Sequence, residues 1–156
     1  MNLQHIVTLA EKTDEEEVRT LLLEQGLDIC GAIEDHVLIK SQEQICAAGK
    51  LHQTSTDKFH LEVLGVRKDM IHTGVGKQLL KALINQPWRF CHSTQELENY
   101  RVTTVAKGGA EGFYEKLDFK PCSFSELDDI YIEQCDNCPD RGNICHPSPM
   151  MWKKRG

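Results

Sequence analysis

Hydrophobic and polar positions recur along the chain with the periods of strands and helices. Short apolar and β-branched runs predict strands, and they cover residues 5–10, 36–40, 45–51, 58–66, 101–106 and 119–124. Apolar residues three or four positions apart predict helices, and these cover residues 13–25, 74–86 and 110–117. The order of the elements predicts an α+β fold with a mixed, mostly antiparallel central sheet flanked by helices.

Within residues 58–66 the alternation assigns the side chains to two faces. One face carries Phe59, Leu61 and Val63, and the other carries His60, Glu62 and Leu64. His60 and Glu62 are therefore predicted to point the same way as Leu64. Both can take up a proton, although the more ordinary interpretation is a satisfied or solvated residue of a strand.

Composition and charge narrow the class of protein. The 156 residues match the size of one α/β domain. Eighteen basic and 24 acidic residues give a net charge of -6, and without a basic block to follow a phosphate backbone we expect no nucleic-acid partner. The sequence has neither a signal-like start nor a membrane-spanning apolar run, which predicts a soluble cytoplasmic protein without membrane association.

A glycine-containing loop joins the strand at residues 58–66 to the helix that follows. Gly74-Val75-Gly76 stands where that helix begins. Glycines at such a point let a ligand approach the backbone, and the unpaired N–H groups of a helix start suit phosphate. The loop therefore predicts an anion site, although by itself the pattern is equally typical of an ordinary turn.

Two motifs in this order resemble the signatures of the GNAT superfamily of N-acetyltransferases. The first is Leu64-Gly65-Val66, followed after seven residues by Gly74-Val75-Gly76 and then Leu79-Leu80. The second is Gly112-Phe113-Tyr114-Glu115-Lys116-Leu117-Asp118-Phe119, similar to the family's Phe-Tyr-x-x-x-Gly-Phe. The resemblance covers residues 5–124 and implies a GNAT-like fold, with residues 1–125 forming a domain that binds acetyl-coenzyme A (acetyl-CoA).

The resemblance implies which positions bind this cosubstrate. Leu64 and Val66 would offer main-chain groups to the pantetheine, and the amides of residues 73–77 would hold the pyrophosphate. The full set is Leu64, Val66, Ile71, His72, Thr73, Gly74, Val75, Gly76, Lys77, Lys107, Phe113 and Tyr114. The chain departs from the family's pattern at Ile71, which replaces Gln or Arg, at Lys107, which replaces Asn, and at Asp118, which replaces Gly.

The same resemblance implies direct transfer of the acetyl group to an amine. The amine has to lose a proton and the leaving thiolate has to gain one. In many GNAT sequences the position of His60 carries a glutamate that acts as base, so His60 or Glu62 is the expected base. Tyr114 matches the family's general-acid tyrosine, and a half-buried aromatic with a wet hydroxyl is an equally good interpretation of it.

The C-terminal segment contains three of the seven cysteines. Cys135, Cys138, Cys145 and His146 can close a tetrahedral zinc site, while reduced thiols that pack the tail, or a redox disulfide, are alternatives. We expect residues 126–156 to form a Cys-rich extension packed on the same domain. Trp152-Lys153-Lys154-Arg155 is expected to be a solvated basic end.

Three functional hypotheses follow. The first is an N-acetyltransferase that moves acetyl from acetyl-CoA to a primary amine of a small molecule such as an amino acid. Cys145 with Met150 loosely resembles the tail of small acetylglutamate-synthase-type enzymes, which ranks such amines first. The second is a non-catalytic acyl-CoA-binding or zinc-bearing interaction module, favoured by Ile71. The third is an unrelated α+β domain. For a homodimer, an exposed edge strand or the last strand is the expected interface.

Overall fold

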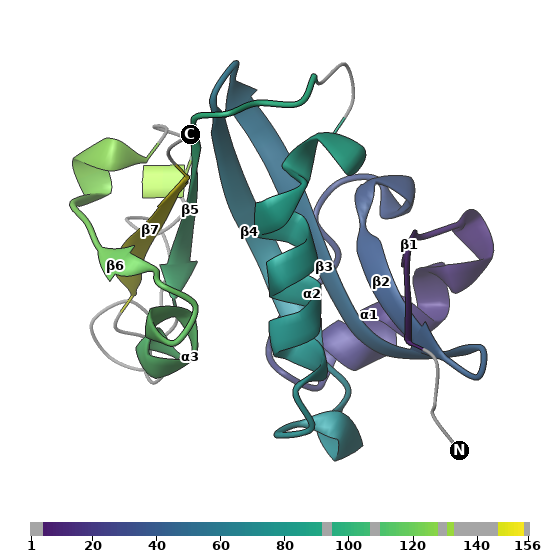
Figure 1. Ribbon diagram of the computed structural model, residues 1–156. Helices are drawn as coiled ribbons and strands as arrows, with labels where there is room; N and C mark the ends of the chain where they lie inside the picture. Colours follow the sequence, from purple (N-terminus) through teal and green to yellow (C-terminus); the bar gives the residue numbers. More distant parts are fainter. Residues whose placement is uncertain (1–4, 92–94, 107–109, 128–130, 133–146, 155–156) are drawn as a thin grey trace. The chain divides into compact units, whose positions relative to one another are not determined.

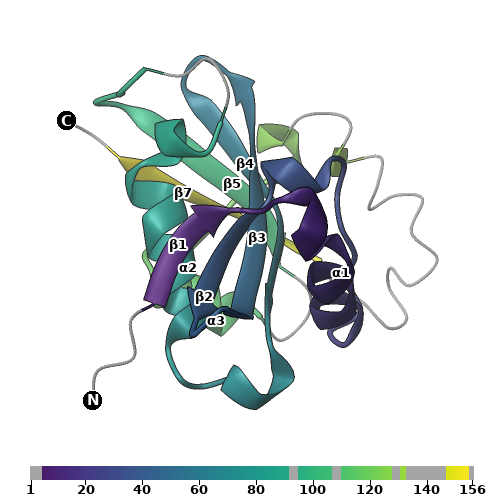
Figure 2. The same cartoon turned by 90° about the vertical axis from the view of Figure 1, so that its right-hand side faces the viewer.

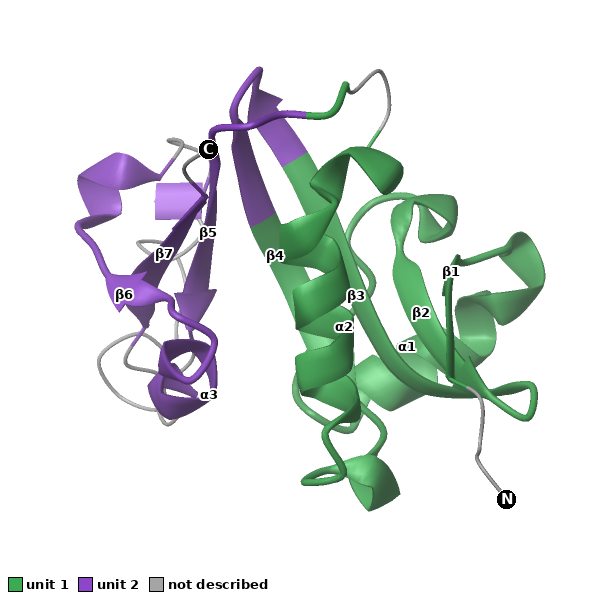
Figure 3. Ribbon diagram, viewed as in Figure 1, with its two compact units in different colours: residues 1–52, 61–96 green, residues 53–60, 97–156 purple. Residues whose placement is uncertain are grey.

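The computed structural model describes residues 5–91, 95–106, 110–127, 131–132 and 147–154 (Figure 1). The chain divides into two compact units (Figure 3), of which unit 1 comprises residues 1–52 and 61–96 and unit 2 comprises residues 53–60 and 97–156. The strands follow the order β1-β2-β3-β4-β5-β7-β6. The boundary predicted after residue 125 falls inside unit 2 and stays a prediction.

Unit 1 is built on the first strands of the chain. They are β1 (His5–Leu9), β2 (Val37–Ser41), most of β3 (Gln44–Ser55) and the second part of β4 (Lys58–Val66). β1 pairs antiparallel with β2, and β2 pairs antiparallel with β3. The turn between β2 and β3 places Gln42 and Glu43 at positive φ, as in tight hairpins.

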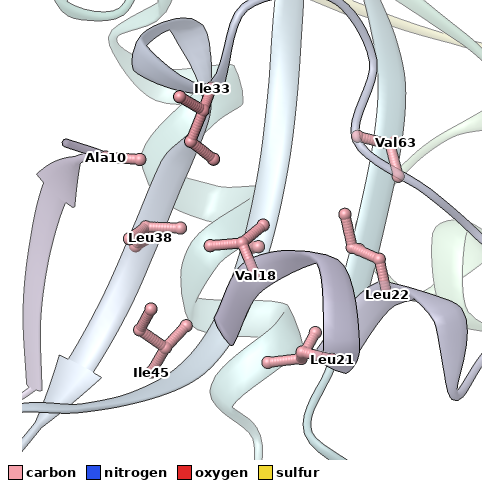
Figure 4. Close-up of a cluster of buried hydrophobic side chains, with 9 residues drawn as sticks. Ala10, Val18, Leu21, Leu22, Ile33, Leu38, Ile45 and Val63 are labelled. Atoms are coloured by element: carbon pink, nitrogen blue, oxygen red, sulfur yellow. The ribbon is translucent and has the colours of Figure 1, made fainter. Parts of the chain in front are cut away.

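Two helices cover the opposite faces of the unit 1 sheet (Figures 1 and 2). α1 (Glu15–Leu23) follows a short 3-10 turn at Lys12–Asp14, and α2 (Val75–Asn85) follows β4. The apolar side of α1, with Val18, Leu21 and Leu22, packs on Leu38, Ile45 and Val63 of the strands (Figure 4). No helix among the described residues is both long and apolar enough to cross a membrane.

Unit 2 is built on the later strands. They are β5 (Tyr100–Ala106), β6 (Lys120–Pro121) and β7 (Ser148–Lys154), with α3 (Glu111–Glu115) between β5 and β6. β7 pairs antiparallel with β5 along its whole length and with β6 at Met150 and Met151. The sheet is thus mostly antiparallel, and the predicted α+β class is confirmed.

The basic C-terminal end forms a strand and not an irregular tail, although Lys153 and Lys154 are exposed to solvent as expected. Trp152, Lys153 and Lys154 belong to β7, and the Trp152 ring lies 5.7 Å from the ring of Tyr100 on β5. Met150, in the same strand, is completely buried. The strand depends on pairing with β5, far upstream in the sequence, and local composition gives no sign of that pairing.

The strand predicted at residues 119–124 is much shorter in the structure. Strand β6 comprises Lys120 and Pro121 alone, and the N–H of Cys122 just after it donates to the carbonyl of Pro149 in β7. Pro121 lacks an N–H for a ladder, and the chain then enters a 3-10 turn at Phe124–Glu126, where the Ser123 side chain accepts a hydrogen bond from the N–H of Ser125. Local side-chain bonding therefore ends the strand early.

Candidate active site

The loop from β4 to α2 ends in a left-handed residue at the helix start. Gly74 is the N-cap of α2 with φ of 89°, and a Cβ built on it would meet nothing within 4 Å. The N–H of Gln78 donates to the oxygen of Gly74 at 3.0 Å, so the N–H groups of Val75, Gly76 and Lys77 precede the first intrahelical bond. An open helix start with these donors is the geometry that a phosphate requires.

The residues just before Gly74 are exposed. Ile71 is 44% exposed, and His72 has a positive φ of 72°. The Thr73 hydroxyl donates to the carbonyl of Met70 at 2.5 Å, which closes the turn. Ile71 has no polar atom in its side chain, so it adds no side-chain contact to an anion held by the N–H groups of the helix start.

At the end of β4 the main chain of Val66 is bound by the side chain of Gln25. The N–H of Arg67 donates to Cys46 on β3 at 2.7 Å. Successive residues of a strand direct their main-chain groups to opposite sides, so those of Val66 point away from β3. The Gln25 amide donates to the Val66 carbonyl and accepts from the Val66 N–H at 3.1 Å.

Glu62 and Leu64 lie on opposite faces of β4, contrary to the predicted alternation. A Cβ on Gly49 would lie 3.1 Å from Leu64 Cδ1, whereas the next residue of β3, Lys50, forms an ion pair with Glu62. Positions 49 and 50 of a strand face opposite sides. Val63 packs on the α1 side, which is also the side of Glu62. Two consecutive residues on one face are the mark of a β-bulge.

Glu62 is held in a mostly buried ion pair. The side chains of Lys50 and Glu62 are 11% and 12% exposed. Burial raises the pKa of the neighbouring Cys30 thiol, and the negative charge of Glu62 raises it further. The carboxylate of Glu62 is engaged by the ammonium group of Lys50. This environment favours a structural role for Glu62.

His60 is fixed by two neighbours in unit 2. Its ring is 3% exposed and stacks on Tyr131, with centroids 3.7 Å apart and planes at 15°. Nδ1 lies 2.8 Å from the hydroxyl oxygen of Thr103, and that hydroxyl donates to the carbonyl of Phe59 at 3.4 Å. The Thr103 oxygen therefore accepts from Nδ1–H, which makes Nε2 the basic nitrogen of the neutral ring.

Tyr114 lies on α3 and is buried rather than half-buried. Its side chain is 8% exposed, and burial raises its pKa to about 12 against the opposing effect of a hydrogen bond with the Thr104 side chain. The ring meets Phe113 and Phe119 edge-on, at 5.2 and 5.4 Å between centroids. At neutral pH the phenol keeps its proton and can donate a hydrogen bond.

Asp118 takes the conformation of the glycine that it replaces in the second motif. Its φ is 71°. The N–H of Phe119 donates to Tyr114 and the N–H of Asp118 donates to Glu115, both at 3.1 Å, which is the Schellman pattern of a helix end. The contact between Phe119 and Tyr114 supplies the hydrophobic pair that accompanies this motif.

The predicted site residues fall in different parts of the molecule. Unit 1 contains Glu62, Leu64, Val66 and residues 71–77, whereas unit 2 contains His60, Phe113 and Tyr114. Lys107 lies outside the described residues, as do the predicted zinc ligands Cys135, Cys138, Cys145 and His146. In the part of the chain that is described, no three potential metal ligands gather. None of Cys30, Cys46, Cys91 and Cys122 forms a disulfide within the described residues.

Sequence patterns missed three residues that shape the site. Gln25, Thr103 and Thr104 bond the very groups that were singled out, namely Val66, His60 and Tyr114. The two threonines are ordinary strand residues by composition. Gln25 stands at a helix end, where polar residues are common, and no local pattern indicates its partner.

Solved structures with the same fold include several acetyltransferases. N-acetylglutamate synthase from Neisseria gonorrhoeae, complexed with coenzyme A and N-acetyl-glutamate, has a TM-score of 0.75 and 14% identity; it covers 100% of this chain, which spans 36% of that protein. The ribosomal-protein-S18-alanine N-acetyltransferase from Escherichia coli has a TM-score of 0.70 and 13% identity, over 98% of this chain and 96% of the other.

A GNAT family acetyltransferase from Bacillus cereus has a TM-score of 0.62 and 12% identity, over 98% of this chain and 99% of the other. At these identities the likenesses establish the fold. No curated protein sequence matches the chain. The family described as acetyltransferase (GNAT) domain matches residues 32–121, more than half of the chain, so the hypothesis of an unrelated domain is wrong. The resemblance drawn from the two motifs is confirmed: the chain belongs to the GNAT family of acetyltransferases.

Proposed function

We propose that the protein transfers the acetyl group of acetyl-CoA directly to the primary amine of a small molecule such as an amino acid. Membership of the GNAT family supports the reaction type. The observation that carries the proposal lies in unit 2, where His60 bonds Thr103 and Tyr114 bonds Thr104. Successive residues of a strand face opposite sides, so a base and a hydrogen-bond donor flank β5.

Direct transfer needs proton control at two different atoms, the amine nitrogen and the leaving sulfur, and His60 and Tyr114 are the proposed groups for these two tasks. In the proposed step the amine nitrogen bonds the acetyl carbon while the carbon–sulfur bond breaks, and the amine proton goes to Nε2 of His60. Tyr114 has a pKa of about 12, well above the value of about 8.5 for a cysteine thiol, which is the reference for the leaving thiolate. Full proton transfer from the phenol is uphill, so Tyr114 stabilises the thiolate as a hydrogen-bond donor.

Acetyl-CoA supplies the activated thioester, and the chain offers groups that fit its polar parts. The first-turn N–H groups of α2 and the left-handed Gly74 suit the pyrophosphate. The main-chain groups of Val66 point away from β3, which suits the amides of the pantetheine. These main-chain groups support acetyl-CoA as cosubstrate even though the side chain of Ile71 cannot hydrogen-bond to phosphate.

A titration with coenzyme A tests the cosubstrate. Lys77→Glu places a negative charge on the first turn of α2, where the side chain is exposed, and we expect it to weaken binding at least tenfold through repulsion of phosphate. Lys81→Glu makes the same charge change one turn later and is the matched control. Equal weakening by both variants, or no binding by the wild-type protein, would contradict the proposal.

The acceptor is tested by release of free thiol from acetyl-CoA. We expect turnover with a panel of amino acids and little with peptides that present a free N-terminus. Turnover only with peptides would refute the small-molecule acceptor and leave acetyl transfer intact. Binding of coenzyme A without turnover on either panel would support the non-catalytic interaction module instead.

We also propose that the protein is cytoplasmic, that it forms a homodimer, and that its C-terminal segment binds a structural zinc ion. Metal analysis of the purified protein tests the zinc.

A further inference from the structure

The main-chain groups of Val66 that suit a pantetheine amide are already engaged within the chain. Gln25 bonds both of them. We propose that the Gln25 side chain is an internal substitute for the pantetheine, and that acetyl-CoA has to displace it from Val66 in order to bind. This inference rests on the proposed function, since it concerns how the cosubstrate reaches its site.

The two hydrogen bonds between Gln25 and Val66 resemble those that a neighbouring strand or an amide ligand would form with Val66. One amide group donates to the carbonyl and accepts from the N–H of a single residue, as in the ladder of a sheet. The pantetheine of coenzyme A carries amides with the same donor and acceptor. Gln25 and the pantetheine therefore compete for the N–H and the carbonyl of Val66, and the two cannot bind them at the same time.

The position of Gln25 is fixed by the way α1 ends. The N–H of Leu27 donates to Leu22 at 2.9 Å and the N–H of Gly26 donates to Leu23 at 3.1 Å, while Gly26 has φ of 72°. This is a Schellman motif with Gln25 at the C-cap. Because the backbone is held, a change of side-chain rotamer is enough to release Val66.

Gly65 lets the end of α1 come close enough for this contact. A Cβ on Gly65 would lie 2.7 Å from Leu22 Cδ2 and 3.2 Å from the Gln25 side-chain oxygen. Any larger residue would press on these two side chains and force them to shift. Gly65, the glycine of the first motif, thus leaves room for the Gln25 amide to reach Val66, the next residue of β4.

A ligand that has to displace an internal group binds more weakly than its own contacts allow. Removing the Gln25 amide leaves the Val66 groups to water, which a pantetheine amide replaces at little cost. A net hydrogen bond is worth about a factor of two to ten in an equilibrium constant. We therefore expect Gln25→Ala to bind coenzyme A about threefold to tenfold more tightly than the wild-type protein.

Calorimetric titration with coenzyme A tests this expectation. Glu24→Ala, an exposed neighbour at the same helix end, is the matched control and should leave the dissociation constant unchanged. Wild-type binding that Gln25→Ala leaves unchanged or weakens would overturn the inference alone. Absence of binding in every variant would overturn the proposed function and this inference with it.

A second measurement uses the wild-type chain and does not depend on a folded variant. The side-chain NH2 signals of Gln25, assigned through their bonds to the main chain by NMR of the wild-type protein, should shift and exchange faster with water when coenzyme A saturates the protein. The main-chain N–H of Val66 should stay protected, because its partner is exchanged rather than lost. Gln25 NH2 signals that keep their position and protection at saturation would show that the amide is not displaced.

Discussion

His60 and Tyr114 lie on opposite faces of strand β5, because they bond the successive residues Thr103 and Thr104. Both threonines are buried, and their pairing with Met151 and Met150 of β7 continues without a shift of register. The regular strand therefore sets the orientation of both side chains. A small change on β5 is expected to alter one partner and leave the other in place.

Thr103 is predicted to set the tautomer of His60. Thr103→Val keeps the shape but removes the acceptor for Nδ1–H, so both tautomers of the ring become populated and less of Nε2 is available as base. We expect kcat to fall by about tenfold, a part of the contribution of a general base, with little change in KM. Imidazole nitrogen shifts measured by NMR should move toward a mixture of tautomers.

Thr103→Ser keeps the hydroxyl and is the matched control for the valine variant. It should restore both the nitrogen shifts and most of the activity. If the valine variant lost activity while its His60 nitrogen shifts stayed as in the wild type, the threonine would act by some route other than the tautomer.

Tyr114 is predicted to act as a protonated hydrogen-bond donor throughout the physiological pH range. Its pKa rises from 10.0 to about 12 by burial, so its contribution to stability is present below pH 10 and is lost as pH rises through about 12. We expect Tyr114→Phe to lower kcat about a hundredfold, as the loss of a donor to developing negative charge does. The pH–rate profile of the wild type should show no limb from this phenol below pH 10.

Ultraviolet titration of tyrosinate in the folded protein checks the raised pKa of Tyr114. The wild-type curve minus the Tyr114→Phe curve should show one group that ionises near pH 12. A difference curve with its midpoint near pH 10 would contradict the burial argument.

Asp118 is predicted to be a site where glycine is the more stable residue. Its φ of 71° is a conformation that strains residues with a Cβ, and aspartate only partly tolerates it. Asp118→Gly should raise the free energy of unfolding by about 0.5–1 kcal/mol, and Asp118→Ala should lower it by a similar amount. Chemical denaturation of the three proteins measures the order, and a glycine variant less stable than alanine would refute the assignment.

The sequence predicted the elements whose burial is local and regular. The alternation in residues 58–66 matches the bounds of β4, and Gly26 marks the end of α1 because a left-handed residue is needed there. The same alternation failed at Glu62, since a break in a strand depends on the packing of neighbouring elements. β7 was missed because it forms only by pairing with β5.

The candidate site was predictable only where the family's motifs mark it. Gly74 and Tyr114 occupy the expected kinds of position, a helix start and a short helix. The partners of the marked residues were not predictable. The contact between Gln25 and Val66 joins residues 41 positions apart, and no periodicity carries information over that distance.

Separate substitution of His60 and Glu62, the two candidate bases, distinguishes a catalytic role from a packing role for each residue. His60→Gln should lower kcat at least a hundredfold, as the loss of a general base does, because Nε2 of His60 takes the amine proton in the proposed step. Glu62→Gln should lower kcat less than threefold but destabilise the fold by about 2–3 kcal/mol, since it leaves Lys50 as an unpaired charge that is 11% exposed. The double variant Lys50→Met/Glu62→Leu removes both charges and should recover most of that stability. A large loss of kcat in a stably folded Glu62→Gln, with His60→Gln active, would identify Glu62 as the base and assign the contacts of His60 to packing.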